Sequence, residues 1–267
     1  MSIDFILFYV IIFFLGSVFG SFACCQAWRI HEKSEGKNLG KRSVCINCGE
    51  KLKWYDNIPL ISWFMLRGKC RNCKAKIGRA EILSELGLGL TFFAIAYKYF
   101  SGLETVTSFF SSPVELMVQP LILLVAFIIY WIVLVYDAKW GELPVILMLI
   151  EIPLAIAFQF AVGGDLVKTA VGTGLLTGIY YLLYFFSKEK AVGGGDWILC
   201  ISISIFLGHW CLAFVELFLS NFTASIFSAP QALRKEKKPI PFGPFLILSM
   251  LVVLLLSDYL LKFLIIY

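Results

Sequence analysis

Two aspartates lie at the edges of apolar segments, where their side chains could carry out acid–base chemistry. Asp196 follows the glycine run 193–195 and opens one apolar segment, and Asp137 closes an earlier one. A carboxylate at the edge of a membrane segment is costly unless it has a function or a partner. Two carboxylates held close together share a proton, so one can activate water while the other protonates a peptide carbonyl oxygen. The pair therefore predicts peptide hydrolysis without a metal or a covalent intermediate.

The surroundings of Asp196 suit this role, although a simpler interpretation stays open for each aspartate. Gly193 and Gly195 allow a substrate backbone or a neighbouring helix to come close, and the helix dipole favours a carboxylate at a helix start. The alternative is that Asp196 only caps a helix and that Asp137 is only an interfacial charge. The case for a site depends on both residues lying at the same face of the membrane.

Four cysteines form a second group with chemical meaning. Cys45 and Cys48 make one Cys-x-x-Cys pair, Cys70 and Cys73 make another, and 21 residues separate the pairs. Two such pairs can complete a closed tetrahedral zinc site, whereas a redox pair or four unrelated thiols is the alternative. A closed four-sulfur site does not catalyse, so we expect it to stabilise a segment too small for a good core. The apolar stretch 58–64 between the pairs could pack on this zinc module or lie in the membrane interface.

The composition is that of a polytopic α-helical membrane protein. Apolar residues make up 60% of the 267-residue chain, against about 45–50% in soluble domains, and the mean hydropathy is +0.85. The first apolar run, residues 5–28, carries no charge and is long enough to span a bilayer. We interpret it as a retained span because no Lys or Arg precedes it, unlike a signal peptide.

The apolar segments predict eight transmembrane helices. They lie at about residues 5–28, 81–100, 120–136, 143–162, 167–186 and 245–266, with two more inside 197–233 that meet near Gly208-His209-Trp210. The stretch 29–79 holds thirteen Lys or Arg against four acids, which places it in the cytoplasm and both termini outside. The basic loop 234–238 is then internal, and only Lys98, Lys168 and Lys262 fall outside.

This topology brings Asp137 and Asp196 to the cytoplasmic side, although 59 positions separate them. It also explains the net charge of +5 by membrane sidedness, so we expect membrane lipid and no nucleic acid as a partner. The expected division is a first transmembrane helix at 1–28, a cytoplasmic zinc-knuckle segment at 29–80 and a transmembrane aspartic peptidase core at 81–267. The remaining membrane acids, Glu85, Glu142, Glu151 and Glu216, are expected to make bundle hydrogen bonds or line a substrate groove rather than catalyse.

Six motifs in order along nearly the whole chain resemble the type IV prepilin peptidase family, the membrane aspartic peptidases that also process pseudopilins. They are Gly20-Ser21-Phe22, the two cysteine pairs, Trp54 to Trp63 with Leu66 to Cys70, Asp137 to Pro144, Gly193-x-Gly195-Asp196, and Pro241-Phe242-Gly243-Pro244. The Gly-x-Gly-Asp motif is shared more loosely with presenilin-like proteases. Each motif is weak by itself, and the order of all six is specific.

The resemblance implies that Asp137 and Asp196 are the catalytic pair. It implies cleavage at the cytoplasmic face of a prokaryotic inner (cytoplasmic) membrane, where the substrate is a prepilin with a short basic leader, a Gly-Phe-like junction and a long apolar helix. Pilus assembly, type II secretion and DNA-uptake pseudopili are all compatible. The matching residues of the active-site loops are Pro144, Gly193, Gly195 and Gly243.

The resemblance also leaves a second activity open. Many members of the family methylate the new N-terminus with S-adenosylmethionine, and those with the zinc segment are often bifunctional. No residue pattern in this chain by itself indicates a methyl-donor site. Two departures from the family pattern, Val145 after the first motif and Ile198 after the second aspartate, leave the carboxylates themselves in place and bear on the substrate groove or on the electrostatic setting of the aspartates.

Two other functional classes stay open from the residues alone. One is a non-enzymatic membrane scaffold with a zinc-stapled cytoplasmic domain, and the other is a proton-coupled transporter with Asp137 and Asp196 as a relay. The separation of the two carboxylates distinguishes them, because a peptidase needs both to reach one water molecule and a scaffold does not.

Overall fold

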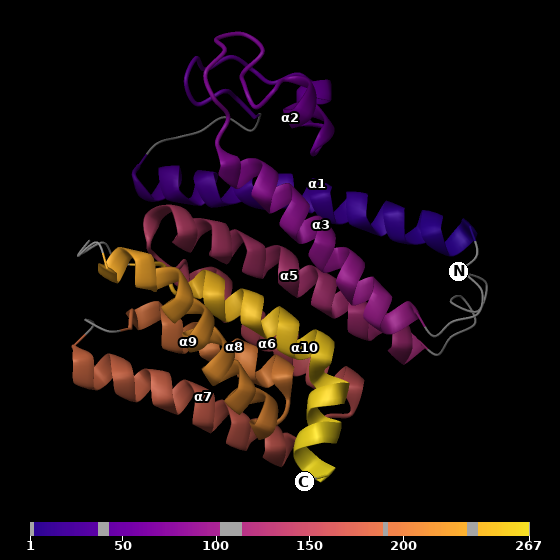
Figure 1. Ribbon diagram of the computed structural model, residues 1–267, viewed down its shortest axis with the longest axis vertical. Helices are drawn as coiled ribbons and strands as arrows, with labels where there is room; N and C mark the ends of the chain where they lie inside the picture. The colour runs from indigo at the N-terminus through magenta and orange to yellow at the C-terminus, as the bar shows by residue number, and fades with distance from the viewer. Residues whose placement is uncertain (1–2, 37–42, 102–113, 189–191, 234–239, 267) are drawn as a thin grey trace. The chain divides into compact units, whose positions relative to one another are not determined.

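The computed structural model describes residues 3–36, 43–101, 114–188, 192–233 and 240–266 as an all-α protein (Figure 1). The chain divides into two compact units, residues 1–112 and 113–267, and each is described by itself. Within the described ranges, seven helices are long and apolar enough to cross a membrane. This confirms a multi-pass α-helical membrane protein. The predicted basic loop 234–238 lies outside the described residues.

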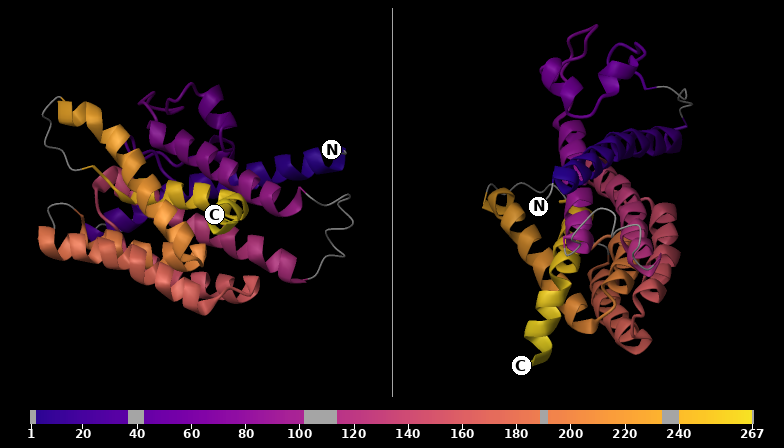
Figure 2. Two further views of the ribbon diagram at one scale, coloured as in Figure 1. Left: turned by 60° about the horizontal axis from the view of Figure 1, so that its bottom comes forward. Right: turned by 90° about the vertical axis from the view of Figure 1, so that its right-hand side faces the viewer.

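The first unit consists of two long helices and the cysteine-bearing insertion between them. α1 (Ile3–Ser34) and α3 (Arg79–Phe100) pack along each other (Figure 2). Gly16 and Gly20 of α1 allow this approach, because a Cβ at Gly16 would lie 2.7 Å from the Leu88 carbonyl oxygen and one at Gly20 would meet Ser84. The Ser84 hydroxyl also donates to the Gly20 carbonyl over 2.7 Å. Small residues and short interhelical hydrogen bonds are typical of packing in membranes.

The second unit contains six helices in consecutive order. They are α5 (Val114–Trp140), α6 (Val145–Val162), α7 (Leu166–Ser187), α8 (Gly194–Leu207), α9 (Trp210–Leu233) and α10 (Gly243–Ile266). The predicted hairpin near residue 208 is confirmed: α8 ends at Leu207 and α9 begins at Trp210. Gly208 makes the turn at a φ of +64°, which a glycine adopts without steric cost.

α8 is a short helix in the interior of this unit. It contacts α6, α7, α9 and α10, and its side chains at Leu199, Cys200 and Ile203 are fully buried. Its 14 residues extend about 21 Å at 1.5 Å per residue, less than the roughly 30 Å hydrocarbon core of a bilayer. At least one end of α8 therefore lies within the thickness of the membrane, with protein rather than lipid around it.

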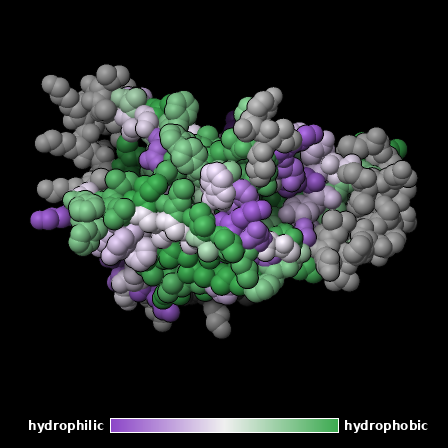
Figure 3. All heavy atoms as spheres, turned by 90° about the horizontal axis from the view of Figure 1, so that it is seen from below, coloured by the Kyte–Doolittle hydropathy of each residue, from purple (hydrophilic) through white to green (hydrophobic). Residues whose placement is uncertain are grey.

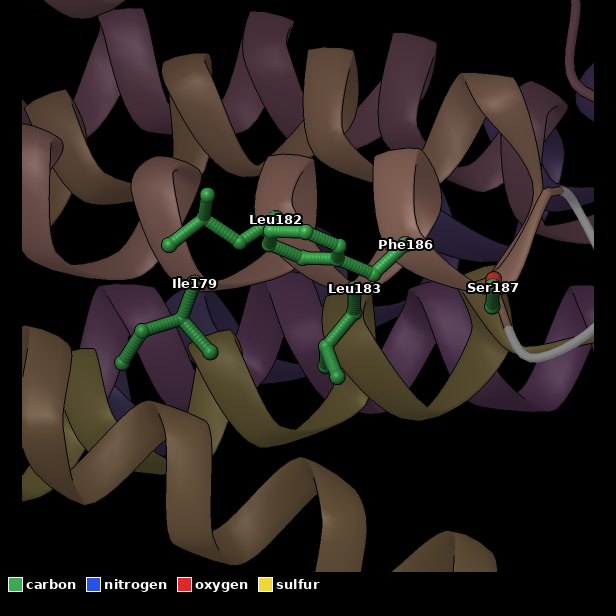
Figure 4. A pocket seen from close by; sticks show the side chains of 5 residues that line it. All are labelled: Ile179, Leu182, Leu183, Phe186 and Ser187. Atoms are coloured by element: carbon green, nitrogen blue, oxygen red, sulfur yellow. The ribbon is translucent and has the colours of Figure 1, made fainter.

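Apolar side chains cover much of the face drawn in Figure 3. On α7 the side chains of Ile179, Leu182, Leu183 and Phe186 line a shallow hollow that ends at Ser187 (Figure 4). Such an exposed apolar surface is expected of helices that face lipid tails. The glycines of α7 differ in their surroundings. Gly172 lies against the α8–α9 turn, whereas a Cβ at Gly174 or Gly178 would meet nothing within 4 Å.

Candidate active site and metal centre

Asp137 lies in the last turn of α5 rather than in the loop predicted to begin there. The helix continues to Trp140, so the prediction of a loop from Asp137 to Glu142 was wrong in its first residues. One contact that favours continuation of the helix is that the rings of Tyr136 and Trp140, one turn apart, pack at a tilt with their centroids separated by 5.0 Å. The carboxylate is 4% exposed, and the backbone N–H of Gly243 donates to its Oδ2 over 2.9 Å.

Asp196 lies in the first turn of α8, as the sequence predicts. Its side chain is 6% exposed and turns back so that Oδ2 accepts the backbone N–H of Gly193 over 2.9 Å. Gly193 precedes the helix with extended backbone angles. This contact satisfies one of the N–H groups at the helix start and fixes the orientation of the carboxylate.

Both carboxylates lie at the same end of the second unit. The end of α5 and the starts of α8 and α10 gather at the left of that unit in Figure 1, and the charge of Asp196 is close enough to act on Asp137. Each carboxylate also accepts a backbone N–H at a helix start, Asp196 at α8 and Asp137 at α10. The positive ends of two helix dipoles thus oppose the cost of holding two acids together in a buried place.

The loop between α5 and α6 is held against both helix starts by one side chain. A Cβ on Gly195 would lie 2.7 Å from the Leu143 Cβ, and one on Gly243 would lie 3.1 Å from the Leu143 Cδ2 and 2.8 Å from the Asp137 Oδ2. Leu143 therefore occupies the space that these two glycines leave open. Pro144 follows in extended conformation and caps the start of α6. The structure brings the sequence-predicted residues Asp137, Pro144, Gly195, Asp196 and Gly243 together.

A buried polar cluster in the second unit confirms the bundle hydrogen bond predicted for Glu216, although sequence reasoning missed its partners. On α9, Glu216 is fully buried and its Oε1 lies 2.6 Å from the Ser249 hydroxyl of α10. One turn further on α9, Ser220 lies 3.3 Å from the hydroxyl of Tyr180 on α7. Tyr180 in turn stacks on Phe242, immediately before the start of α10, with ring centroids 5.6 Å apart. The cluster links α7 and α9 to α10, and the backbone N–H of Gly243 at the start of α10 donates to Asp137.

No pattern in the sequence pairs these residues, because they come from three separate helices. The only signal was that Glu216 stands alone as an acid in a long apolar run, which indicates a partner in the bundle.

The four predicted metal ligands form one cluster in the first unit. The sulfur atoms of Cys45, Cys48, Cys70 and Cys73 all lie within 4.8 Å of one another, and those of Cys45 and Cys73 are 3.9 Å apart. The edge of a tetrahedral four-sulfur zinc site is about 3.8 Å for a zinc–sulfur distance of about 2.3 Å. The cluster therefore fits a structural metal ion.

Hydrogen bonds prepare one of these thiols for metal binding. The backbone N–H of Ala75 and then the side chain of Asn47 lower the pKa of the Cys73 thiol to about 6. A thiolate is the form that binds metal, so these donors favour the ligating form at neutral pH.

The two cysteine knuckles share one backbone design, although the sequence suggests no internal repeat. In each Cys-x-x-Cys pair, the residue that follows the second cysteine has a positive φ. It is Gly49 in the first pair, at +70°, and Lys74 in the second, at +58°. Their N–H groups bond the carbonyls of Cys45 and Cys70 over 2.8 and 3.1 Å. Glycine adopts positive φ without strain, and Lys74 shows that the same turn forms without a glycine at a greater steric cost.

The fold and the site define a polytopic membrane protein with a buried aspartate pair and a separate four-cysteine metal centre. Comparison with known proteins agrees. Residues 14–99 match the family model described as the bacterial peptidase A24 N-terminal domain. The chain is 30% identical over 260 residues to the prepilin leader peptidase/N-methyltransferase of Vibrio cholerae, covering 92% of this chain and 96% of that protein.

Further relatives carry the same name. The protein of Aeromonas salmonicida is 30% identical over 81% of this chain and 72% of its own length, and that of Myxococcus xanthus is 32% identical over 80% and 60%. No solved structure matches the chain. The chain belongs to the prepilin leader peptidase/N-methyltransferase family.

Proposed function

We propose that this protein is a membrane-embedded aspartic endopeptidase that removes the short basic leader from type IV prepilins or pseudopilins. The observation that carries the proposal is the burial of Asp137 and Asp196 at one end of a helical unit, close enough for their charges to interact. Membership of the family agrees with it. A scaffold has no need of two acids buried together at one end of a helical bundle.

The chemistry follows from two carboxylates that share one proton. The ionised aspartate removes a proton from a water molecule, whose oxygen adds to the scissile carbonyl carbon, while the protonated aspartate donates to the carbonyl oxygen. When the tetrahedral intermediate collapses, the aspartate that took the proton from water gives it to the leaving amine, a hydroxyl of the intermediate returns its proton to the other aspartate, and the C–N bond breaks. The N–H groups of Gly193 and Gly243 each hold one Oδ2, so the second oxygen of each carboxylate is the one that acts on substrate and water.

The glycines have a second role in this proposal. A Cβ on Gly193, which precedes the catalytic carboxylate of α8, would meet only the Asp196 Oδ2 at 3.3 Å, so this edge of the site is backbone, whereas Leu143 fills the space beside Gly195 and Gly243. A substrate in an extended conformation at its cleavage site can approach such edges closely. Pro144 completes this rim. The long apolar helix of the substrate stays in the membrane during cleavage.

The remaining assignments are part of the same proposal. The metal at the four cysteines is zinc in a structural role, and the segment 29–80 that holds it is a cytoplasmic insertion between the helix 1–28 and the peptidase core 81–267. The protein resides in the inner (cytoplasmic) membrane with Asp137 and Asp196 facing the cytoplasm. The relatives named N-methyltransferase support a second activity that methylates the new N-terminus with S-adenosylmethionine.

The test is a cleavage assay in membranes with a prepilin-like substrate and mass determination of the product. Wild type is expected to release the leader, and Asp137→Asn and Asp196→Asn are each expected to release none while inserting normally. The mass of the mature product also reports methylation directly. Cleavage by either variant at a rate close to that of wild type would overturn the assignment of the pair.

A further inference from the structure

The segment between the two cysteine knuckles exposes large apolar side chains on two short helices. They are η1 (Trp54–Asn57) and α2 (Ile61–Met65), which contact each other. Trp54 is 79% exposed, Phe64 65% and Met65 77%. Ile61 is also exposed, and positions 61, 64 and 65 share one face of a helix because they are three and four residues apart. An apolar face of this kind needs a partner.

The start of α2 is fixed to the side of the membrane helix α3. The backbone N–H of Leu60 donates to Oε2 of Glu85 over 2.7 Å. Leu60 has a φ of +62°, which is strained for a branched residue and persists only where its surroundings hold it. Glu85 comes six residues after Arg79, where α3 begins, or about 9 Å along the helix. α2 therefore lies beside the first turns of a membrane span and not out in the cytoplasm.

The charge around this apolar face is positive. Asp56 is paired with Arg71 over 2.8 Å, and Glu50 is the other acid within residues 43–78. The exposed cations of the segment are Lys51, Lys53, Arg67, Lys69, Arg71, Lys74 and Lys76. Such a surface attracts anionic phospholipid headgroups and repels a basic leader peptide.

We propose that η1 and α2 form an interfacial membrane anchor. Trp54, Ile61, Phe64 and Met65 insert at the boundary of headgroups and acyl chains, and the neighbouring lysines and arginines bind anionic phospholipids. Aromatic and apolar residues at this depth, with cations above them, are the usual composition of a segment that lies in the interface. The hydrogen bond from Leu60 to Glu85 sets the depth of the anchor.

The experiment uses the full-length protein in nanodiscs that contain a phospholipid with a photoreactive acyl chain. Label on residues 53–66 is read by mass spectrometry. In wild type we expect strong labelling of this segment, and about a five-fold decrease in the Phe64→Ser, Met65→Ser double variant, with the metal still bound. Replacing phosphatidylcholine by an equal mixture with phosphatidylglycerol is expected to raise labelling about three-fold at low salt, because anionic headgroups attract the cations near the surface.

Two matched controls separate the anchor from general effects. Val10→Ser on α1, at a lipid-facing position that is 44% exposed, is expected to leave labelling of 53–66 unchanged. Glu85→Gln keeps an oxygen to accept the Leu60 N–H and is expected to label as wild type, whereas Glu85→Leu is expected to label less. Labelling of 53–66 in wild type no stronger than that of the exposed polar stretch 74–76 would overturn the proposal. Equal labelling of the wild type and the double variant would overturn it as well.

Discussion

The backbone N–H of Gly243, the first residue of α10, donates to Oδ2 of Asp137, near the end of α5, over 2.9 Å. The two residues are 106 positions apart in the chain, and this contact joins the late Pro-Phe-Gly-Pro motif to the first aspartate. It also explains why a glycine stands at this position, because a Cβ would lie 2.8 Å from the same carboxylate oxygen.

The first prediction follows from that contact. Gly243→Ala is expected to displace the Asp137 carboxylate and to lower the rate of prepilin cleavage about 10- to 100-fold, since small misplacements of catalytic groups have effects of this size. The matched control is Gly178→Ala, where a Cβ meets nothing within 4 Å and activity is expected to be unchanged. The initial cleavage rates of the two variants are compared in membranes that contain equal amounts of protein. Equal rates for Gly243→Ala and Gly178→Ala would contradict the account.

The buried pair of Glu216 and Ser249 yields the second prediction. The Ser249 hydroxyl lies 2.6 Å from both the Glu216 Oε1 and the Phe245 carbonyl oxygen, and it has one hydrogen to donate. The Ser249 hydroxyl donates to Oε1 of Glu216, and this buried carboxyl oxygen would lose its partner if the hydroxyl were removed. Ser249→Ala should therefore destabilise the protein by about 1–3 kcal/mol, the cost of an unsatisfied buried group.

The measurement is the apparent melting temperature of the purified protein in detergent. Ser228→Ala is the control, because Ser228 is only partly buried and its hydroxyl donates to a carbonyl of its own helix over 3.0 Å. A decrease for Ser249→Ala no larger than that for the control would show that the pair contributes little. Glu216→Gln, which keeps a donor and an acceptor, is expected to fall between Ser249→Ala and wild type.

The metal centre supports a third prediction. Cys70→Ser removes one of four clustered thiols and is expected to abolish stoichiometric zinc binding and to lower the protein level in membranes, because binding energy of the metal is folding energy of its site. Cys25→Ser, on α1 and outside the cluster, is expected to retain zinc. Elemental analysis of both purified variants decides, and a wild-type protein without zinc would require another account of the knuckles.

Packing of the first unit provides a fourth prediction. Gly20→Ala places a Cβ against the backbone of Ser84, which cannot move as a flexible side chain could. We expect α1 and α3 to separate and the variant to be destabilised by about 1–3 kcal/mol, the usual cost of overpacking. Gly174→Ala, with open space around it, should match wild type in the same melting experiment. A Gly20→Ala protein as stable as wild type would show that the helices adapt.

The sequence predicted the aspartates better than it predicted their surroundings. Asp196 follows a glycine run that lies between two apolar segments. Its position at a helix start could therefore be predicted from the neighbouring residues in the sequence alone. Asp137 was expected to lie just after a span because a charge ends the apolar run there. A helix can continue past its last apolar residue, and α5 continues to Trp140. The contact from Gly243 depends on the packing of three helices, and no local pattern encodes it.

The same distinction applies to the membrane spans and the metal centre. The cysteine spacing predicts the four-sulfur cluster because both pairs are close in sequence. The short length of α8 was not predicted, since residues 197–233 have the length of two ordinary spans. α8 can be short because it lies among other helices, and this depends on the tertiary structure. The link between Leu60 and Glu85 likewise requires a backbone conformation that sequence propensity disfavours.

The most direct test of the account is a double-mutant cycle on cleavage with wild type, Asp137→Asn, Asp196→Asn and the double variant, each inserted to the same level. If the two carboxylates act as one unit on one water molecule, each single substitution will reduce the single-turnover rate by nearly as much as both together, because residues that act as a unit are strongly non-additive. Independent effects that multiply in the double variant would contradict the shared-proton pair.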